Sequence, residues 1–458
     1  MPVNSFADFP MSWRPNRREF GPGPAYLELA SRLEADIASG SLPPGTKLPP
    51  QRELADFLDL NFTTVTRAYD VCRERGLIYG VVGRGTFVAA RERSAEGNEE
   101  IVDCGVVQGF AGLGGHFVSD AARTILARSS TERLFSYVAR DGWPNHREAG
   151  ARWLARAGVE AAAEQVMIFP GVQSALSTAL LTLFRVGDAL AVDRFTYSNL
   201  IHLSRLAHVR LVPIDGDGKG LLPEALREAS EREPRLRGVF LMPYCANPTT
   251  VTLSESRKDA LAEVARERNL VVLEDDVRLA QAPQDVRPIY ARLPEATVYL
   301  SGSVRLVAPG LRVTYVACSD RLAERLRPGL HHLTIKASAL EAEILSELVV
   351  SGTAERILAA KRKKARAANA VFDSVFGGDG GDPERMFRTL PCRRTAGTGT
   401  ELEAYYVAKG VRICHSDRFA VRPGEREPFL RVSVSSAPDL KSLKRGLLCL
   451  TDKCVSNI

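Results

Sequence analysis

The 458-residue sequence lacks the features that several classes of protein require. It has no run of 18 apolar residues and no amino-terminal signal pattern, which argues against a membrane-spanning or secreted protein and predicts a cytoplasmic one. Its eight cysteines include no C-x-x-C pair, and its seven histidines form no cluster at metal-ligand spacing. We therefore expect reduced, mostly buried thiols, and neither disulfides nor a metal site.

An excess of charge of one sign is also missing. The 61 Lys and Arg residues against 55 Asp and Glu leave a formal charge of only +6. Residues 11–94 hold 12 basic and 10 acidic side chains, so no strong basic patch is expected there and any attraction to nucleic acid depends on local placement. The hydrophobic content of 45% is enough for a sizeable core at this length, which predicts two or three domains.

Residues 48–88 have the pattern of a compact DNA-binding module. Residues 51–58 place Leu54 and Leu58 on one helical face, and a second helical run begins at Asn61. After Gly76 the sequence alternates as a strand pair around a glycine-flanked arginine. Two short helices with a tight joint, followed by a hairpin, are therefore expected.

The outer face of the second predicted helix carries hydroxyl groups and a guanidinium, which suit base edges and phosphates in a major groove. The arginine at the hairpin tip suits a minor groove. Upstream, residues 26–37 predict an amphipathic helix that ends before Gly40. We expect contacts with double-stranded DNA from Arg52, Thr63, Thr64, Thr66, Arg67 and Arg84.

Five short motifs carry a resemblance to the GntR-type winged helix. They are P-x-Y at 24–26, G-x-L-x-x-G at 40–45, LPPQREL at 48–54, TTVTRAY at 63–69 and GRGTFV at 83–88. The resemblance implies a DNA-binding domain, and the alternative is a winged helix used for protein contacts alone. The family often has arginine where Phe62 stands, which puts one phosphate or base contact in doubt.

Beyond residue 108 the sequence predicts an α/β fold. Residues 91–108 are polar and without strong periodicity, as in a linker. Helical stretches then alternate with apolar runs, which predicts a mostly parallel sheet flanked by helices. From about residue 319 long amphipathic helices follow, with strands near 401–408 and 428–435, as in a smaller α+β domain. The expected strands of the sheet are 165–169, 189–193, 209–214, 238–243, 270–275 and 297–302.

The order of motifs in this second part is similar to that of the fold-type-I aminotransferases. With the winged helix in front, the whole chain resembles the MocR/GabR regulators. The resemblance implies a large aminotransferase-like domain that binds pyridoxal phosphate (PLP) as a ligand sensor, within a homodimer. The implied parts are a winged helix at 20–90, a linker at 91–108, a large domain at 109–320 and a small C-terminal α+β domain at 321–458.

The resemblance assigns the first ligand-binding positions to PGVQSAL and DRFTYSN. In PGVQSAL, Gly171 and Gln173 match a turn that opens a helix, where backbone N–H groups can hold a phosphate. In DRFTYSN, Tyr197 corresponds to the aromatic ring that stacks on the PLP pyridine.

Three further positions complete the outline of the pocket. Asn247 matches the amide that bonds the ring hydroxyl, although Thr250 replaces a usual glycine nearby. Asp275 matches the carboxylate that pairs with the pyridinium nitrogen. Arg431 matches the arginine that grips a substrate carboxylate.

The Schiff-base lysine of the family is missing. The family pattern K-x-x-x-P-x-x-R-x-x-Y aligns without a gap on residues 305–315, in which Pro309, Arg312 and Tyr315 match and Arg305 occupies the lysine position. A guanidinium stays charged and cannot form the Schiff base. No catalytic residue and no covalently bound PLP are therefore expected, and no other lysine lies between Lys258 and Lys336.

Two more departures affect the same pocket, because Val277 replaces a tyrosine and Gly302 replaces a hydroxyl residue. Three interpretations remain open. Arg305 and Arg312 hold a small anionic or amino-acid-like effector, with Arg431 at a second carboxylate; or Arg305 pairs with Asp275 in a dimerisation scaffold; or PLP binds noncovalently. We expect a transcription regulator, and the alternative is a PLP-dependent aminotransferase-family protein with residual transaminase activity.

Overall fold

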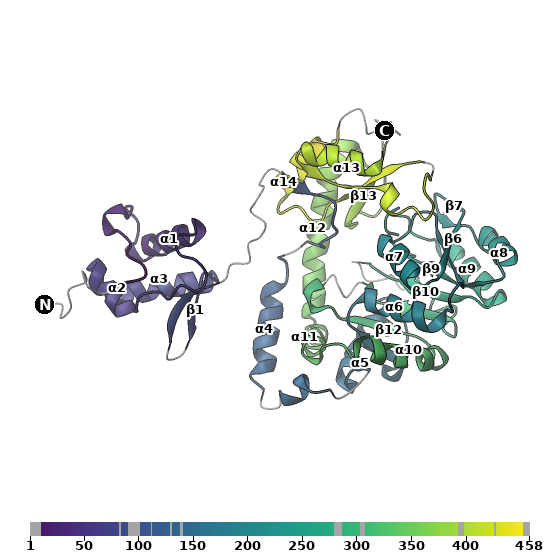
Figure 1. The fold of residues 1–458 in the computed structure, drawn as a ribbon, viewed down its shortest axis with the longest axis horizontal. Helices are drawn as coiled ribbons and strands as arrows, with labels where there is room; N and C mark the ends of the chain where they lie inside the picture. The colour runs from purple at the N-terminus through teal and green to yellow at the C-terminus, as the bar shows by residue number, and fades with distance from the viewer. Residues whose placement is uncertain are drawn as a thin grey trace. The chain divides into compact units, whose positions relative to one another are not determined.

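In the computed structural model, the backbone divides into two compact units, Met1–Glu99 and Glu100–Ile458 (Figure 1). No helix among the described residues is long and apolar enough to cross a membrane. The same residues contain no group of three or more His, Cys, Asp or Glu side chains placed to hold a metal ion. The structure describes residues 11–81, 84–89, 101–110, 112–128, 131–137, 141–278, 286–302, 307–392, 398–425 and 427–451.

The described residues of the first unit form three α-helices and an antiparallel hairpin, as the sequence predicted. The helix expected at 26–37 is confirmed with slightly wider bounds. The joint between the second and third helices turns at Asp59, whose φ of 51° is one that aspartate tolerates, and Asn61 caps the third helix by accepting from the Thr63 N–H at 3.0 Å. The elements are α1 (Ala25–Ala38), α2 (Gln51–Leu58), α3 (Phe62–Glu74), β1 (Ile78–Val81) and β2 (Gly85–Val88), with a 3₁₀ turn at Arg17–Glu19.

A single apolar core holds this unit together. All three helices contribute to it through residues spaced three or four apart, such as Leu54 and Leu58 of α2. Tyr69 is fully buried, and its hydroxyl donates to the Pro49 carbonyl at 2.9 Å. The core therefore fixes the inner face of α3 and leaves its outer face to solvent.

The second unit is built on a seven-stranded sheet in the order β4-β12-β11-β10-β9-β5-β6. The strands from β11 to β6 are parallel to one another, as expected. β12 is antiparallel to both β11 and β4, so the sheet is mixed. The strands are β4 (Val166–Phe169), β5 (Ala189–Asp193), β6 (Arg210–Ile214), β9 (Leu236–Leu241), β10 (Val271–Asp275), β11 (Thr297–Leu300) and β12 (Thr314–Ala317).

Helices cover both faces of this sheet. Alternate residues of β5 point to opposite faces, so that Leu190 packs with α6, α7 and α10 while Ala191 packs with α8 and α9. A short hairpin, β7 (Gly216–Asp217) and β8 (Gly220–Leu221), follows β6. The helices that cover the sheet are α5 (Pro144–Ala155), α6 (Val172–Leu183), α7 (Ser198–Leu206), α8 (Pro223–Arg232), α9 (Glu255–Glu267) and α10 (Asp320–Thr334).

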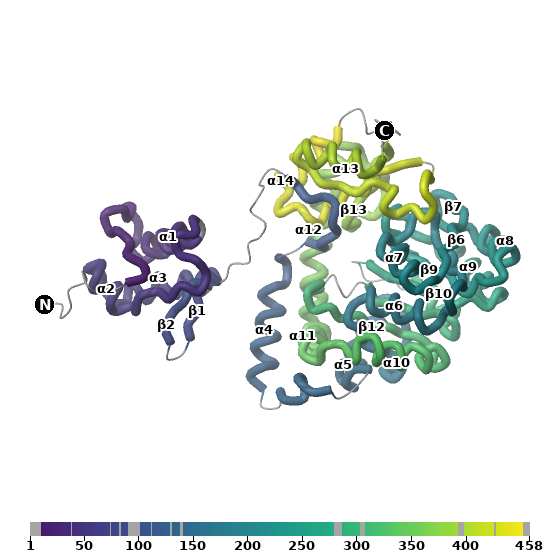
Figure 2. The backbone as a smooth tube through the Cα atoms, viewed as in Figure 1, coloured from purple at the N-terminus to yellow at the C-terminus, as the bar shows by residue number. Residues whose placement is uncertain are grey.

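The C-terminal part forms a smaller α+β lobe (Figure 2). Its three-stranded antiparallel sheet has the order β13-β16-β15, and β14 pairs in parallel with β3. Gly114, before α4, lies against Ile357 of the long helix α12. The elements are β3 (Val102–Asp103), α4 (Gly115–Leu126), α11 (Ala339–Val350), α12 (Thr353–Phe376), β13 (Phe387–Pro391), α13 (Gly399–Ala408), β14 (Val411–Arg412), β15 (Cys414–His415), β16 (Phe429–Ser433) and α14 (Leu440–Leu448).

The strand expected near 401–408 was wrong, because these residues form α13. Thr398 and Glu401 make a capping box: the Thr398 hydroxyl accepts from the Glu401 N–H at 3.3 Å, and the Glu401 carboxylate accepts from the Thr398 N–H at 2.7 Å. The strand expected at 428–435 is confirmed as β16. Residues 91–100 of the expected linker at 91–108 lie outside the described residues, whereas β3 is part of the C-terminal lobe.

Candidate nucleic-acid interface and candidate ligand pocket

The starts of α2 and α3 come together at the surface of the first unit. Arg52, Thr63 and Arg67 are exposed, as expected for DNA-contacting groups, and Thr64 is half-buried. Arg67 makes no ion pair within the part of the chain that the structure describes. The Arg52 guanidinium lies 5.7 Å from the centre of the Phe62 ring. Two sequence-distant cations are therefore presented on one surface.

Two of the predicted hydroxyl groups are engaged within the protein. Thr66 Oγ1 lies 2.9 Å from Gln51 Oε1 and 3.0 Å from the Phe62 carbonyl oxygen, so it ties α3 to α2. Thr63 Oγ1 donates to Asn61 Oδ1 at 2.9 Å. Sequence reasoning missed the roles of Gln51 and Asn61, although asparagine before a helical run is itself a capping signal.

The hairpin between β1 and β2 presents cations as well. Arg84 is exposed, and its N–H donates to the Val81 carbonyl at 3.0 Å. Gly83, expected beside it at the tip, lies outside the described residues. Lys47 pairs with Phe87 of β2, and its side chain runs along Gly85, where an added Cβ would lie 3.0 Å from Lys47 Cε. Lys47 is a second cation at the hairpin that the sequence analysis did not single out.

In the second unit, the predicted ligand-binding residues gather at the carboxyl ends of parallel strands. Gly171 follows β4, Tyr197 follows β5, Asn247 follows β9 and Asp275 ends β10. Open α/β sheets bind ligands along this edge. The structure therefore brings these four positions to one edge of the sheet.

Gly171 and Arg312 form one side of this edge. Gly171 caps α6 with a φ of 87°, and an added Cβ would lie 2.7 Å from Arg312 Nη2. Only glycine suits both the backbone angle and the close guanidinium. Gln173 is half-buried in the first turn of α6. An exposed guanidinium beside the free N–H groups of a helix start is an arrangement that attracts anions.

Arg431 is placed next to Asn247, as the resemblance implied, but it already has acceptors. Its Nη1 donates to Asn247 Oδ1 at 3.0 Å, and its Nη2 donates to the Gly105 carbonyl. Its guanidinium also lies 4.8 Å from the Phe419 ring centre. With 7% of its surface exposed, Arg431 joins the loop after β9 to the segment after β3.

Asp275 is buried at the end of β10, with 3% of its surface exposed. A side chain at Gly302 would collide with Asp275 Oδ1 and with Val277, so the glycine found in place of a hydroxyl residue is required by close packing. The neighbouring Asp276 is held elsewhere, by the Tyr299 hydroxyl at 2.6 Å and by Arg278 at 2.5 Å.

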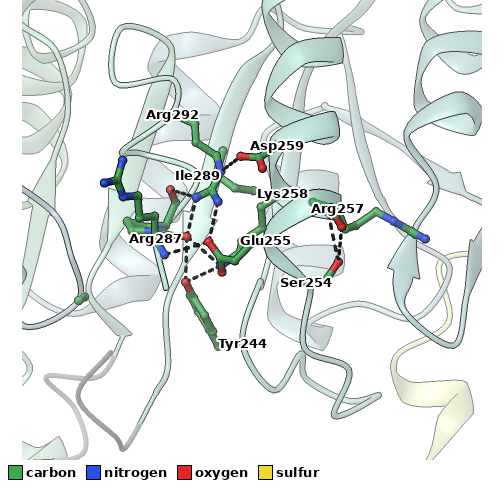
Figure 3. A network of polar contacts seen from close by, with 12 residues as sticks. Tyr244, Ser254, Glu255, Arg257, Lys258, Asp259, Arg287, Ile289 and Arg292 are labelled. Atoms are coloured by element: carbon green, nitrogen blue, oxygen red, sulfur yellow. Dashed lines mark hydrogen bonds and ion pairs between the residues drawn. The ribbon is translucent and has the colours of Figure 1, made fainter. Parts of the chain in front are cut away.

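Arg305 lies in residues 303–306, outside the described residues. Lys258, the nearest lysine before it in the chain, is fully buried in α9 (Figure 3). Its ammonium donates to the Tyr244 hydroxyl at 3.0 Å and to the Arg287 carbonyl at 2.8 Å, and it pairs with Glu255. Burial lowers the pKa of Lys258. This amine is held in a buried network of hydrogen bonds and an ion pair.

A cavity of about 630 Å³ adjoins the strand edge. Its walls are the loops after β9 and β10 and residues 379–387 of the C-terminal lobe. Two of the residues that depart from the family pattern, Thr250 and Val277, line it. Thr250 has a φ of 64°, which is rare for a β-branched residue. Two departures from the family pattern thus fall on the wall of one cavity, whereas Gly302 packs against Asp275 and is not part of that wall.

Comparison with known protein families divides the chain in the same way. Residues 25–88 match the model of bacterial regulatory proteins of the gntR family. Residues 109–373 match the model of aminotransferase class I and II.

The chain is also similar to individual proteins along most of its length. The chain is 32% identical over 459 residues to an uncharacterised HTH-type transcriptional regulator, YdeF, of Bacillus subtilis, covering 98% of each chain. It is 24% identical to the probable rhizopine catabolism regulatory protein MocR of Rhizobium meliloti, covering 71% of this chain and 72% of that one.

A solved archaeal alanine:glyoxylate aminotransferase superposes with a TM-score of 0.70 at 18% identity, covering 78% of this chain and 91% of that one. At this identity the likeness shows the fold alone. The chain belongs to the family of HTH-type transcriptional regulators in which a GntR-family domain precedes a domain of aminotransferase class I and II, and its relatives include MocR.

Proposed function

We propose that this chain is a cytoplasmic, DNA-binding transcription regulator that acts as a homodimer on an operator. The observation that carries the proposal is the surface formed by α2, α3 and the hairpin, where Arg52, Arg67 and Arg84 are exposed on a winged helix. The curated relative that matches along its whole length is named an HTH-type transcriptional regulator. Protein contacts alone would not require these cations around the outer face of α3.

Within this proposal, Thr64 and Arg67 are the residues of α3 that contact bases or phosphates, and Arg84 contacts the minor groove. Thr66 acts differently, because its hydroxyl is held by Gln51 and so positions α3 against α2. Thr63 lies beside them at the capped start of the helix. The interface thus combines contacting groups with groups that hold them in place.

The second unit serves as an effector-sensing and dimerisation module that does not hold PLP covalently. The residues present fit an anion, since Arg312 lies against Gly171 at the start of α6. They fit a pyridoxal ring in outline, with Tyr197 and Asn247 at the same strand edge and Asp275 buried below it. Bound PLP supplies an electron sink to amino-acid chemistry. Arg305 cannot provide the amine that would attach it.

Arg431 and Arg312 make a small anionic or amino-acid-like effector the expected ligand. Such a ligand can change DNA binding only if it binds two arrangements of the protein with different affinities. The second candidate function is an aminotransferase-family protein with noncovalently bound PLP, which is favoured by Asp275 remaining at the strand end.

The DNA-binding proposal is tested by replacing Thr64 and Arg67 together. Sequences bound by the full-length protein are first selected from a random pool, and affinity is then measured at one salt concentration. Thr64→Ala with Arg67→Ala should weaken specific binding at least about 30-fold, because two contacts are lost and each costs about 1–3 kcal/mol. Arg73→Ala is the matched control, since Arg73 on the same helix pairs with Asp70 at 2.5 Å. Equal affinities for the double variant and the control would remove the assignment.

The ligand pocket is tested by titrating wild type and Arg305→Lys with PLP, followed by borohydride reduction and mass measurement. A covalent adduct in the variant alone is expected, and would mean that one substitution separates this pocket from covalent PLP binding. An adduct in the wild type would contradict the assignment of Arg305. Binding by neither protein would leave dimerisation as the role of this domain.

A further inference from the structure

Phe62 is the most unusual residue of the DNA-facing surface. It occupies the first position of α3, and 43% of its surface is exposed. It is not among the buried residues of the first unit's core, to which α3 contributes Val65, Ala68 and Tyr69. An exposed phenyl ring costs free energy in water, and each of its CH groups would be more stable against another apolar group.

The surroundings of Phe62 are cationic and polar rather than apolar. The Arg52 guanidinium stands 5.7 Å from the ring centre, at cation–π distance. Thr63 and Arg67 are exposed on the same helix, and among the described residues neither Arg52 nor Arg67 forms an ion pair. A partner for this surface must therefore be negatively charged and yet offer an apolar group at the ring.

A DNA major groove meets both requirements. Its phosphates and guanine edges attract Arg52 and Arg67, and the C5-methyl of thymine is the apolar group that a major groove presents. A lipid surface would need a larger apolar area than one ring. The Gln51–Thr66 bond holds the starts of α2 and α3 together, so the ring and the Arg52 guanidinium would enter the groove as one unit.

We infer that Phe62 determines operator specificity by contacting a thymine C5-methyl in the major groove, beside the contact made by Arg52. The inference rests on the proposed DNA-binding function and deepens it. An arginine at this position could contact a phosphate or a base through its charge. The phenylalanine can instead make an apolar contact that only thymine offers. Burying one methyl group changes affinity about three- to fivefold at a single base pair.

The test uses the full-length protein and its selected operator. Each thymine is replaced in turn by deoxyuridine, which removes only the C5-methyl and keeps the base pairing. Wild type should lose about three- to fivefold in affinity at one thymine in each half-site. Phe62→Ala should bind the thymine and uracil operators equally well, whereas Phe62→Leu, which keeps an apolar side chain, should retain part of the discrimination.

Two controls keep the result interpretable. Phe135→Ala removes another exposed aromatic, 68% exposed in the second unit, and should keep the full uracil effect. Phe62→Arg should lose the uracil effect and steepen the dependence of log affinity on log salt by about 0.9, through one added phosphate contact. Since Phe62 is exposed, the unfolding midpoint of the variants should match that of wild type.

The outcomes separate the inference from the proposed function. If wild type binds a specific sequence but tolerates uracil at every thymine, the inference is wrong and the proposed function stands. If the uracil effect survives in Phe62→Ala, another residue reads the methyl group and the inference is equally wrong. If no sequence is bound specifically, the proposed function itself fails.

Discussion

The buried carboxylate of Glu343 gives the sharpest stability prediction. Glu343 lies on α11 with 8% of its side chain exposed. His146 Nε2 on α5 lies 2.7 Å from it, Asn145 Nδ2 donates to it at 3.1 Å, and Arg128 and Arg133 stand at 3.4 and 3.7 Å. Removing its charge would leave these donors around a neutral group.

The magnitude follows from the titration of this carboxyl. The hydrogen bond from His146 is the main reason that the pKa of Glu343 falls to about 2, from an ordinary value of 4.5. The difference corresponds to about 3 kcal/mol. Because the folded-state pKa is the lower one, this stabilisation is fully present above pH 4.5 and is lost as the pH falls toward 2.

Urea unfolding of Glu343→Gln measures the effect. Buried Trp153 of the second unit gives the fluorescence signal. At pH 7 the variant should be less stable than wild type by about 3 kcal/mol, and the difference should shrink as the pH falls from 4.5 to 3. Glu347→Gln is the matched control, because Glu347 on the same helix pairs with Arg128 at 2.6 Å but has 35% of its side chain exposed. That exposed pair should contribute less than about 1 kcal/mol.

Two results would refute the reasoning. If Glu343→Gln costs no more than Glu347→Gln at pH 7, the pair with His146 does not stabilise the fold. If the difference between Glu343→Gln and wild type stays constant down to pH 3, the stabilisation does not come from the lowered pKa of this carboxyl.

Three further predictions concern single side chains. Burial lowers the pKa of Lys361 on α12 from 10.5 to about 8, so stability should rise with pH across that range. Lys361→Met should stabilise the fold by about 3 kcal/mol at pH 7 and by little at pH 10.5, and equal gains at both values would contradict the assignment. Gly150→Ala should lower the free energy of unfolding by about 1–3 kcal/mol, because its Cβ would lie 2.7 Å from Tyr315 Cδ1, whereas Gly115→Ala, with open space around it, should be neutral or stabilising. Asn61→Ala should cost the first unit about 1 kcal/mol in thermal unfolding by removing the cap of α3, and an unchanged midpoint would show that the cap is dispensable.

Local patterns predicted the elements whose causes lie within a few residues. The helix predicted at 26–37 is observed as Ala25–Ala38, because its apolar stripe alone fixes its inner face. The strand before Asn247 and the strand that ends at Asp275 were also predicted, because each is a short apolar run. An element can be predicted from the sequence when its formation depends only on residues within that element.

Features that depend on distant partners could not be predicted in this way. Residues 401–408 contain tyrosines and a valine, which favour strands. They nevertheless form a helix, whose start is stabilised by the capping box of Thr398. The hydroxyl of Thr66 seemed available to DNA until Gln51, 15 residues away, proved to hold it. In the same way, nothing near Arg431 in the sequence indicated its bonds to Asn247 and Gly105.

The occupied guanidinium of Arg431 changes how a ligand would be selected at the strand edge. An anion arriving there cannot simply add to the pocket, since it must take over donors that now serve an amide oxygen and a backbone carbonyl. Its binding free energy is then the difference between the free energy of the hydrogen bonds that it forms with Arg431 and that of the hydrogen bonds that Arg431 loses. A neutral acceptor gains nothing by this exchange, whereas a charged carboxylate that accepts two hydrogen bonds does. The existing contacts of Arg431 therefore favour charged ligands over neutral ones.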